Sequence, residues 1–163
     1  MRLKITFASL VGVGLLLYAD SLSAATPTDA CALLTPARVS AVLGVSVGGG
    51  EHIPPARGEL CGWAQPSDTS HSGKRVVLDV FGPIGGLTPA ERFAIGKKPV
   101  NGITKTPVTS LGDDAYYITT PGLGTGLNVK KGAAVFQIRV YGFPVDQIQA
   151  LEKSLAQDVL TKF

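Results

Sequence analysis

The sequence predicts one α+β domain: a single antiparallel β-sheet of about five strands with an N-terminal helix, a short middle helix and a long C-terminal helix packed on it. Three observations lead to this fold class. Several short segments alternate apolar and polar residues, the pattern of strands that bury one face. Turns rich in glycine and proline join these segments, and short connections favour antiparallel pairing. The final segment instead carries apolar residues at helical spacing.

Residues 1–25 are expected to be a secretory signal peptide. Arg2 and Lys4 give a positive start, a mainly apolar stretch covers residues 5–17, and small residues lead to Ala25. The apolar stretch is shorter than the roughly 20 residues that a membrane-spanning helix needs. We therefore expect cleavage near Ala25 and no transmembrane segment afterwards, with a periplasmic or secreted location.

Residues 26–163 are expected to form a single domain. No cysteine follows the apolar stretch at the spacing of a lipid-attachment site, so no lipid anchor is expected. The formal net charge of +3 is too small to indicate nucleic-acid binding. The expected partner is an unknown protein or envelope component, not a nucleic acid.

Two helices have clear boundary signals. Thr35 can cap the free N–H groups of the first helix, and Pro36 fits its first position. Gly44 ends this segment, as glycine commonly does after a helix. The segment Thr88-Pro89-Ala90-Glu91 has the pattern of a capping box, so the short middle helix is expected from there to about Ile95.

The last helix is expected directly after Pro144. Its apolar positions recur at helical spacing and form one stripe: Val145, Ile148, Leu151, Leu155 and Val159. Polar residues are expected on the opposite, solvated side: Gln149, Glu152, Lys153 and Asp158. We expect the apolar stripe to pack on one face of the sheet.

The segments with clear strand patterns are 61–64, 74–81, 114–119, 127–130 and 133–141. Weaker patterns allow short strands at 45–47 and 103–106. Alternation along a strand puts Cys61 and Trp63 on one face. The same alternation puts Tyr116 and Tyr117 on opposite faces, so at least one of these tyrosines is expected to be partly exposed.

Cys31 and Cys61 are the two cysteines of the chain. An exported protein meets an oxidising compartment, where two cysteines pair more often than not. Buried free thiols or a redox couple are the alternatives, although the Cys-x-x-Cys spacing of redox motifs is absent. We favour a structural disulfide that ties the first helix to the strand bearing Trp63.

Several short motifs occur together in a recognisable order: Cys31-Ala32-Leu33-Leu34-Thr35, Val42-Leu43-Gly44, Cys61-Gly62-Trp63, and Leu111-Gly112-Asp113-Asp114-Ala115-Tyr116-Tyr117. This layout resembles small exported bacterial proteins of unknown function, akin to mycobacterial lipoproteins. The resemblance implies a two-cysteine bridge and an antiparallel sheet flanked by helices, and it supplies no catalytic residues. The chain differs from the lipoproteins because it lacks a lipidation cysteine, so membrane tethering is not implied.

Motifs for cofactors and metals are weak. The glycines at 48–50 lack the strand before and the helix after that a phosphate-binding loop needs. The glycines at 122–126 precede a strand, so they offer no helix N-terminus to a pyrophosphate. His52 and His71, both in expected loops, are poorly spaced for a metal site. We expect no cofactor and no metal.

Asp113 and Asp114 are the acidic pair with the strongest case for catalysis. Two carboxylates can act as acid and base when burial separates their pKa values. Neighbouring residues that enter a strand point to opposite faces, however, and aspartate after Gly112 is typical of a turn. An envelope hydrolase or other enzyme that uses acidic residues near this pair is therefore the alternative hypothesis.

The leading hypothesis is a non-enzymatic exported domain that binds a protein, an envelope polymer or a small ligand. No catalytic residue is assigned, because the sequence lacks an assembled set of nucleophile, base and orienting group. Aromatic and basic residues give a possible contact surface, made of Trp63, Tyr117, Lys130 and Lys131.

Overall fold

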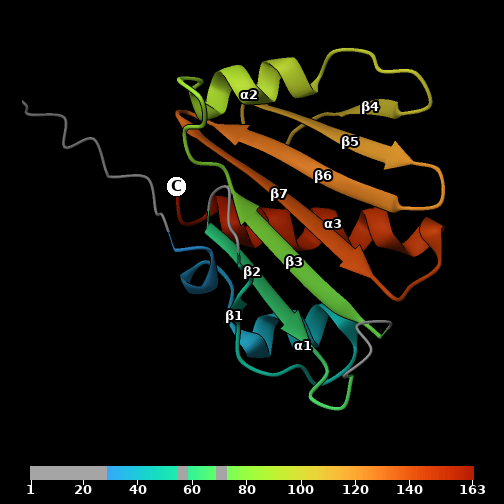
Figure 1. The fold of residues 1–163 in the computed structure, drawn as a ribbon. Coiled ribbons are helices and arrows are strands. Elements are labelled where there is room, and N and C mark those ends of the chain that lie inside the picture. Colours follow the sequence, from blue (N-terminus) through green and yellow to red (C-terminus); the bar gives the residue numbers. More distant parts are fainter. Residues whose placement is uncertain (1–28, 55–58, 69–72) are drawn as a thin grey trace, which may run out of the picture.

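The computed structural model describes residues 29–54, 59–68 and 73–163. The expected signal peptide and His71 lie outside the described residues. The chain folds into a sheet with helices on both faces (Figure 1). Within the described ranges, no helix is both long enough and apolar enough to cross a membrane. In chain order the elements are η1 (Ala30–Ala32), α1 (Pro36–Leu43), β1 (Glu51–His52), β2 (Glu59–Ala64), β3 (Arg75–Val80), α2 (Pro89–Gly96), β4 (Thr104–Val108), β5 (Asp114–Thr120), β6 (Gly124–Lys131), β7 (Ala134–Tyr141) and α3 (Val145–Leu160).

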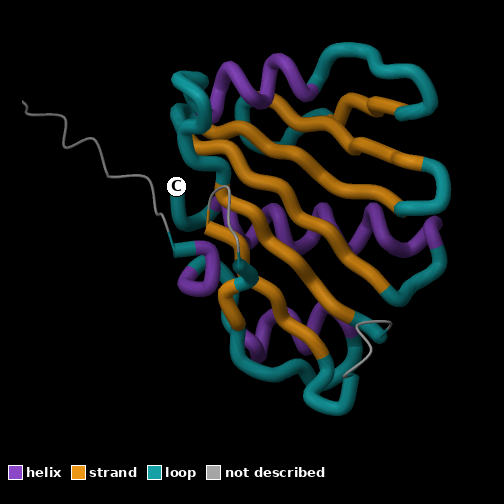
Figure 2. The backbone as a smooth tube through the Cα atoms, in the orientation of Figure 1, coloured by secondary structure: helices purple, strands orange, loops and turns teal. Residues whose placement is uncertain are grey.

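The sheet has seven strands in the order β1-β2-β3-β7-β6-β5-β4, and each neighbouring pair is antiparallel. Strands β3 and β7 are far apart in the chain but lie side by side in the middle of the sheet (Figure 2). The predicted α+β class with one antiparallel sheet is confirmed. The predicted count of about five strands is wrong, because the sheet has seven.

The difference lies at the two edges of the sheet. β1 is two residues long and exposed, and β4 contains Pro107 and has no buried residue. Such short edge strands show no alternation of apolar residues, so the sequence carries little sign of them. The strand allowed at 45–47 does not form, because the chain pairs with β2 at Glu51–His52 instead.

One face of the sheet, called here the inner face, packs against α3 and η1, while α1 packs on α3. In Figure 1, α3 runs behind the strands. Cys61 and Trp63 both point to this face and have no exposed surface, as the alternation predicted. The other large buried side chains of this core include Leu78, Leu127, Phe136, Ile138 and Leu155.

The second face, called here the outer face, carries only α2 at one end. Phe93 of α2 packs against Tyr116, with ring centroids 5.1 Å apart, and against Val135. The capping box predicted at Thr88 is present, since its side chain accepts from the Glu91 N–H and Glu91 accepts from the Thr88 N–H. Because α2 covers Tyr116 and α3 covers Tyr117, both tyrosines are buried. The expectation that one would be partly exposed is wrong.

The disulfide joins Cys31 to Cys61, across a sequence separation of 30. Cys31 lies in η1, the short 3-10 turn before α1, and Cys61 lies in β2. The bridge therefore ties the start of the described chain to the sheet. The residues between the cysteines include a glycine- and proline-rich loop, whose described part contributes the short strand β1 to the sheet.

Helix α3 follows the predicted position but not the predicted faces. Val145 is 65% exposed, whereas Glu152, expected on the solvated side, has no exposed surface. Glu152 lies four residues after Ile148 and three before Leu155, so it belongs to the same buried stripe. Its Oε1 accepts the backbone N–H of Val140 at 3.2 Å.

A local opening of the sheet explains this contact. β6 pairs with β7 only as far as Leu127 opposite Ile138, and Val140 lies two residues beyond that last pair. The carboxyl of Glu152 therefore accepts the N–H of Val140 at a position where β6 offers no pair, although Val140 pairs with Val76 of β3. Burial raises the pKa of Glu152 to about 8, despite the opposing effects of this hydrogen bond and of Arg139.

Glu152 should make the protein less stable as pH rises. A raised pKa in the folded state means that folding stability is complete below the ordinary pKa of 4.5 and is lost as pH rises toward about 8. Glu152→Gln keeps the acceptor for Val140 and cannot ionise. Urea unfolding should show a variant that is more stable than the wild type by roughly 2–4 kcal/mol at pH 8 and similar to it near pH 4.5. Asp146→Asn, an exposed change in the same helix, should keep the wild-type pH dependence, and a parallel pH profile for Glu152→Gln would contradict the assignment.

Removal of the disulfide should lower stability substantially. On the chain-entropy model, a closed loop of this length contributes about 3–4 kcal/mol. We expect Cys31→Ser/Cys61→Ala to show this loss in guanidinium unfolding, and the wild type to show it after reduction. Equal unfolding midpoints with and without reductant would show that the bridge has no stabilising role.

Candidate functional site: a groove on the outer sheet face

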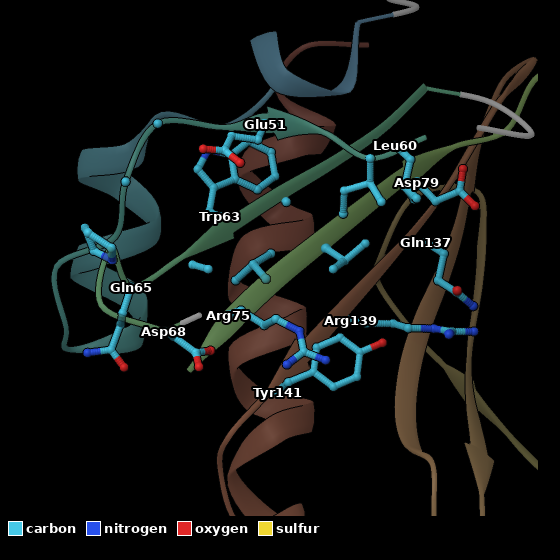
Figure 3. Close-up of a pocket in the computed structure, with 18 residues that line it drawn as sticks. Glu51, Leu60, Trp63, Gln65, Asp68, Arg75, Asp79, Gln137, Arg139 and Tyr141 are labelled. Carbon is cyan, nitrogen blue, oxygen red and sulfur yellow. The ribbon is translucent and has the colours of Figure 1, made fainter. Parts of the chain in front are cut away.

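A groove of about 900 Å³ lies on the outer face, over β2, β3 and β7. Figure 3 shows its side chains, which come from these strands and from the segment around β1. Helix α2 leaves this part of the outer face open, because it packs at one end of the sheet, against Tyr116 and Val135. The volume falls within the usual range of small-molecule sites.

The floor of the groove is made of small residues, and one wall is the segment around β1. Gly62 is central to the floor: a Cβ there would lie 2.9 Å from Cδ1 of Ile53. The missing side chain at Gly62 therefore lets Ile53 fold over β2 on the outer face. The Ile53 N–H donates to the carbonyl of Leu60 at 2.9 Å and holds this wall against the strand.

Most of the polar groups come from six outward-facing residues of β3 and β7, called here the outer cluster. They form three cross-strand pairs: Arg75 with Tyr141, Val77 with Arg139, and Asp79 with Gln137. They share the outer face because they alternate with buried residues of both strands. Arg139 thus has two diagonal neighbours on β3, Arg75 and Asp79, and such positions are roughly 7–8 Å apart.

The two arginines of the outer cluster are held in different ways. The guanidinium of Arg75 lies over the ring of Tyr141, 4.1 Å from its centroid, as Figure 3 shows. Arg139 extends over Gly126 of β6, where an added Cβ would come within 3.0 Å of its Cγ. Among the described residues, neither arginine forms an ion pair. Their N–H donors are therefore left for solvent or a ligand.

The acceptors of the cluster are Asp79 and Gln137. Burial raises the pKa of Asp79 to about 6, while the charges of Arg92 and Arg139 lower it by less. The Oδ1 atom of Asp79 is buried and has no hydrogen-bond partner in the described part of the chain. Gln137 donates from Nε2 to Oδ1 of Asn128 at 3.1 Å, which leaves its carbonyl oxygen as an acceptor.

The residues that the sequence suggested as a contact surface do not come together. Trp63 has no exposed surface and Tyr117 is 7% exposed, so both belong to the core. The hydroxyl of Tyr117 donates to the carbonyl of Gln149 at 2.6 Å. Lys130 and Lys131 lie at the far end of β6 from Gly126. These four residues therefore do not form one exposed contact surface, because both aromatic side chains are buried, Tyr117 against α3.

Asp113 and Asp114 bind different partners. Asp113 accepts the backbone N–H of Gly132 at 2.6 Å, and this bond is the main reason that the pKa of Asp113 is lowered. Asp114 forms an ion pair with Lys97 at 2.7 Å. The two carboxylates tie two turns of the sheet to neighbouring segments and do not face a common site. Nothing in this geometry favours acid–base chemistry at the pair.

His52 lies beside the disulfide. Its Nε2 is 3.4 Å from Oδ1 of Asp29, and its Nδ1 is 3.7 Å from Sγ of Cys31. These three groups are close enough to bind one ion. The sulfur of Cys31 is bonded to Cys61, however, so it cannot act as a thiolate ligand.

One partial sign of the groove is present in the sequence. Val77 and Asp79 form a mixed face of β3, and Gln137 and Arg139 form a polar face of β7. Whether these residues meet depends on strand pairing between distant segments. Comparison of the chain with known protein families, curated proteins and solved structures finds no match.

Proposed function

We propose that the protein is an exported, non-enzymatic binding domain and that the groove on the outer face is its ligand site. One observation carries this proposal: charged and polar side chains of the outer cluster converge on a groove of about 900 Å³ with their hydrogen-bonding capacity partly unused. A concave site with a few convergent polar groups is the usual form of a small-ligand site.

The strands under the groove can recognise a ligand mainly through their side chains. Strands β2, β3 and β7 each have a neighbour on both sides, so their backbone groups already take part in ladders. An extended peptide that adds a strand needs a free sheet edge. The ligand of this groove must therefore be bound from above the sheet, by the outer cluster and the small-residue floor.

The disulfide supports the exported part of the proposal. A bridge such as Cys31–Cys61 persists in an oxidising compartment and is rare in a reducing one. The proposal also includes a signal peptide at residues 1–25, a periplasmic or secreted location, and an envelope component as the binding partner.

A fragment screen by NMR would test the groove as a binding site. We expect hits that shift the amide signals of Gly62, Val77 and Arg139, and we expect these shifts to disappear in Val77→Trp, whose indole would fill the floor. Ile95→Trp places the same side chain at an exposed position of α2 and should retain the hits. A library that gives no hits, or hits that persist in a folded Val77→Trp variant, would contradict the proposed site.

A further inference from the structure

The cationic groups of the groove are concentrated at its β3–β7 side. Arg75 and Arg139 occupy diagonal positions on the outer face, and neither forms a salt bridge among the described residues, although Asp79 is close enough to Arg139 for the two charges to interact. Like charges on neighbouring strands repel each other, and an anion bound near both would relieve this repulsion. Guanidinium groups bind carboxylates through two parallel hydrogen bonds, so a carboxylate fits this side of the groove.

The same side of the groove also needs hydrogen-bond donors from a ligand. Oδ1 of Asp79 is buried without a partner, and the carbonyl oxygen of Gln137 remains an acceptor. Leaving a buried acceptor unsatisfied is unfavourable, and a hydrogen-bond donor from a ligand would offset this cost. Figure 3 shows Asp79, Gln137 and Arg139 extending in the same direction from β3 and β7. A ligand that engages all three must combine an anionic acceptor with several donors.

The β1 side of the groove differs in charge from the β3–β7 side, because it carries the acidic residue Glu51. Glu51 lies on β1, opposite Gly62 of β2, so β2 and β3 separate it from Arg139 of β7. The floor between them is made of small or apolar residues such as Gly62 and Val77. An anionic group is therefore attracted to the β3–β7 side, while uncharged rings can lie over the floor.

We propose that the groove binds a small acidic saccharide, with its carboxylate at Arg139 and Arg75 and its hydroxyl groups at Asp79 and Gln137. This inference rests on the proposed function of the groove and names the chemical class of its ligand. Saccharides that carry a carboxylate supply both an anionic acceptor and many donors on one small molecule. The fully paired strands exclude the backbone recognition that an extended peptide would use.

Calorimetric titration with trigalacturonate tests this assignment, with galactotriose as the neutral counterpart of the same ring number. We expect trigalacturonate to bind at least 10-fold more tightly than galactotriose. Arg139→Gln should weaken its binding at least 10-fold. Gly126→Val, which crowds the side chain of Arg139 but keeps its charge, should weaken binding to a similar degree. Lys162→Gln removes an exposed cation outside the groove and should have no effect.

The alternative outcomes separate this inference from the proposed function. Equal binding of the neutral and acidic saccharides would overturn the carboxylate assignment but leave the groove as the site. Inorganic phosphate or triglutamate that binds as tightly as trigalacturonate would overturn the saccharide class. If neither saccharide binds while fragments still map to the groove, only the ligand class falls. If fragments fail as well, both proposals fall.

Discussion

The pairing of β3 with β7 is the constraint on which the rest of the structure depends. β3 belongs to the first half of the sheet and β7 to the second, and their ladder is the single connection in the sheet between the β1–β3 and β4–β7 groups. On the inner face this ladder brings Val76, Leu78 and Val80 against Phe136, Ile138 and Val140. On the outer face the same register assembles the outer cluster. The core and the candidate site are therefore two sides of one strand pair.

The two faces of that pair are covered unequally, and this inequality creates the groove. The sixteen-residue α3 lies along the inner face and contacts both β6 and β7, whereas the eight-residue α2 covers only one end of the outer face. Polar side chains at outer positions of β3 and β7 are consequently neither buried in a core nor spread over a convex surface. These side chains are half-covered. In such a setting the attraction between a charged side chain and a bound molecule is stronger than in bulk water, and the side chain does not pay the full desolvation cost of burial.

Local signals in the sequence predicted the local parts of the fold. The caps at Thr35 and Thr88 form as expected, because each depends on atoms within a few residues. The alternation in β7 and the pairing of the two cysteines were also predictable. The edge strand β1 was missed and β4 was only weakly indicated, at 103–106, because neither buries a face. Glu152 was assigned to solvent because a charged side chain was assumed to avoid the core, although its position on the helix agrees with the buried stripe.

The candidate site was beyond the reach of the same reasoning. Asp79 and Gln137 become partners only once β3 and β7 pair in one particular register. The role of Gly126 also depends on this arrangement, since its missing side chain matters only when Arg139 lies above it. A single sequence identifies the outward-facing polar residues of each strand but not which of them will meet.

The central position of β7 also has a consequence for the order of folding. β7 is the last strand to be synthesised, and until it is present β3 has an unpaired edge and the two strand groups have no ladder between them. Pairing between distant segments is slow, and exposed strand edges invite association with other chains. The complete sheet can therefore form only once β7, near the C-terminus, is available. For the exported location proposed above, such a delay would be an advantage.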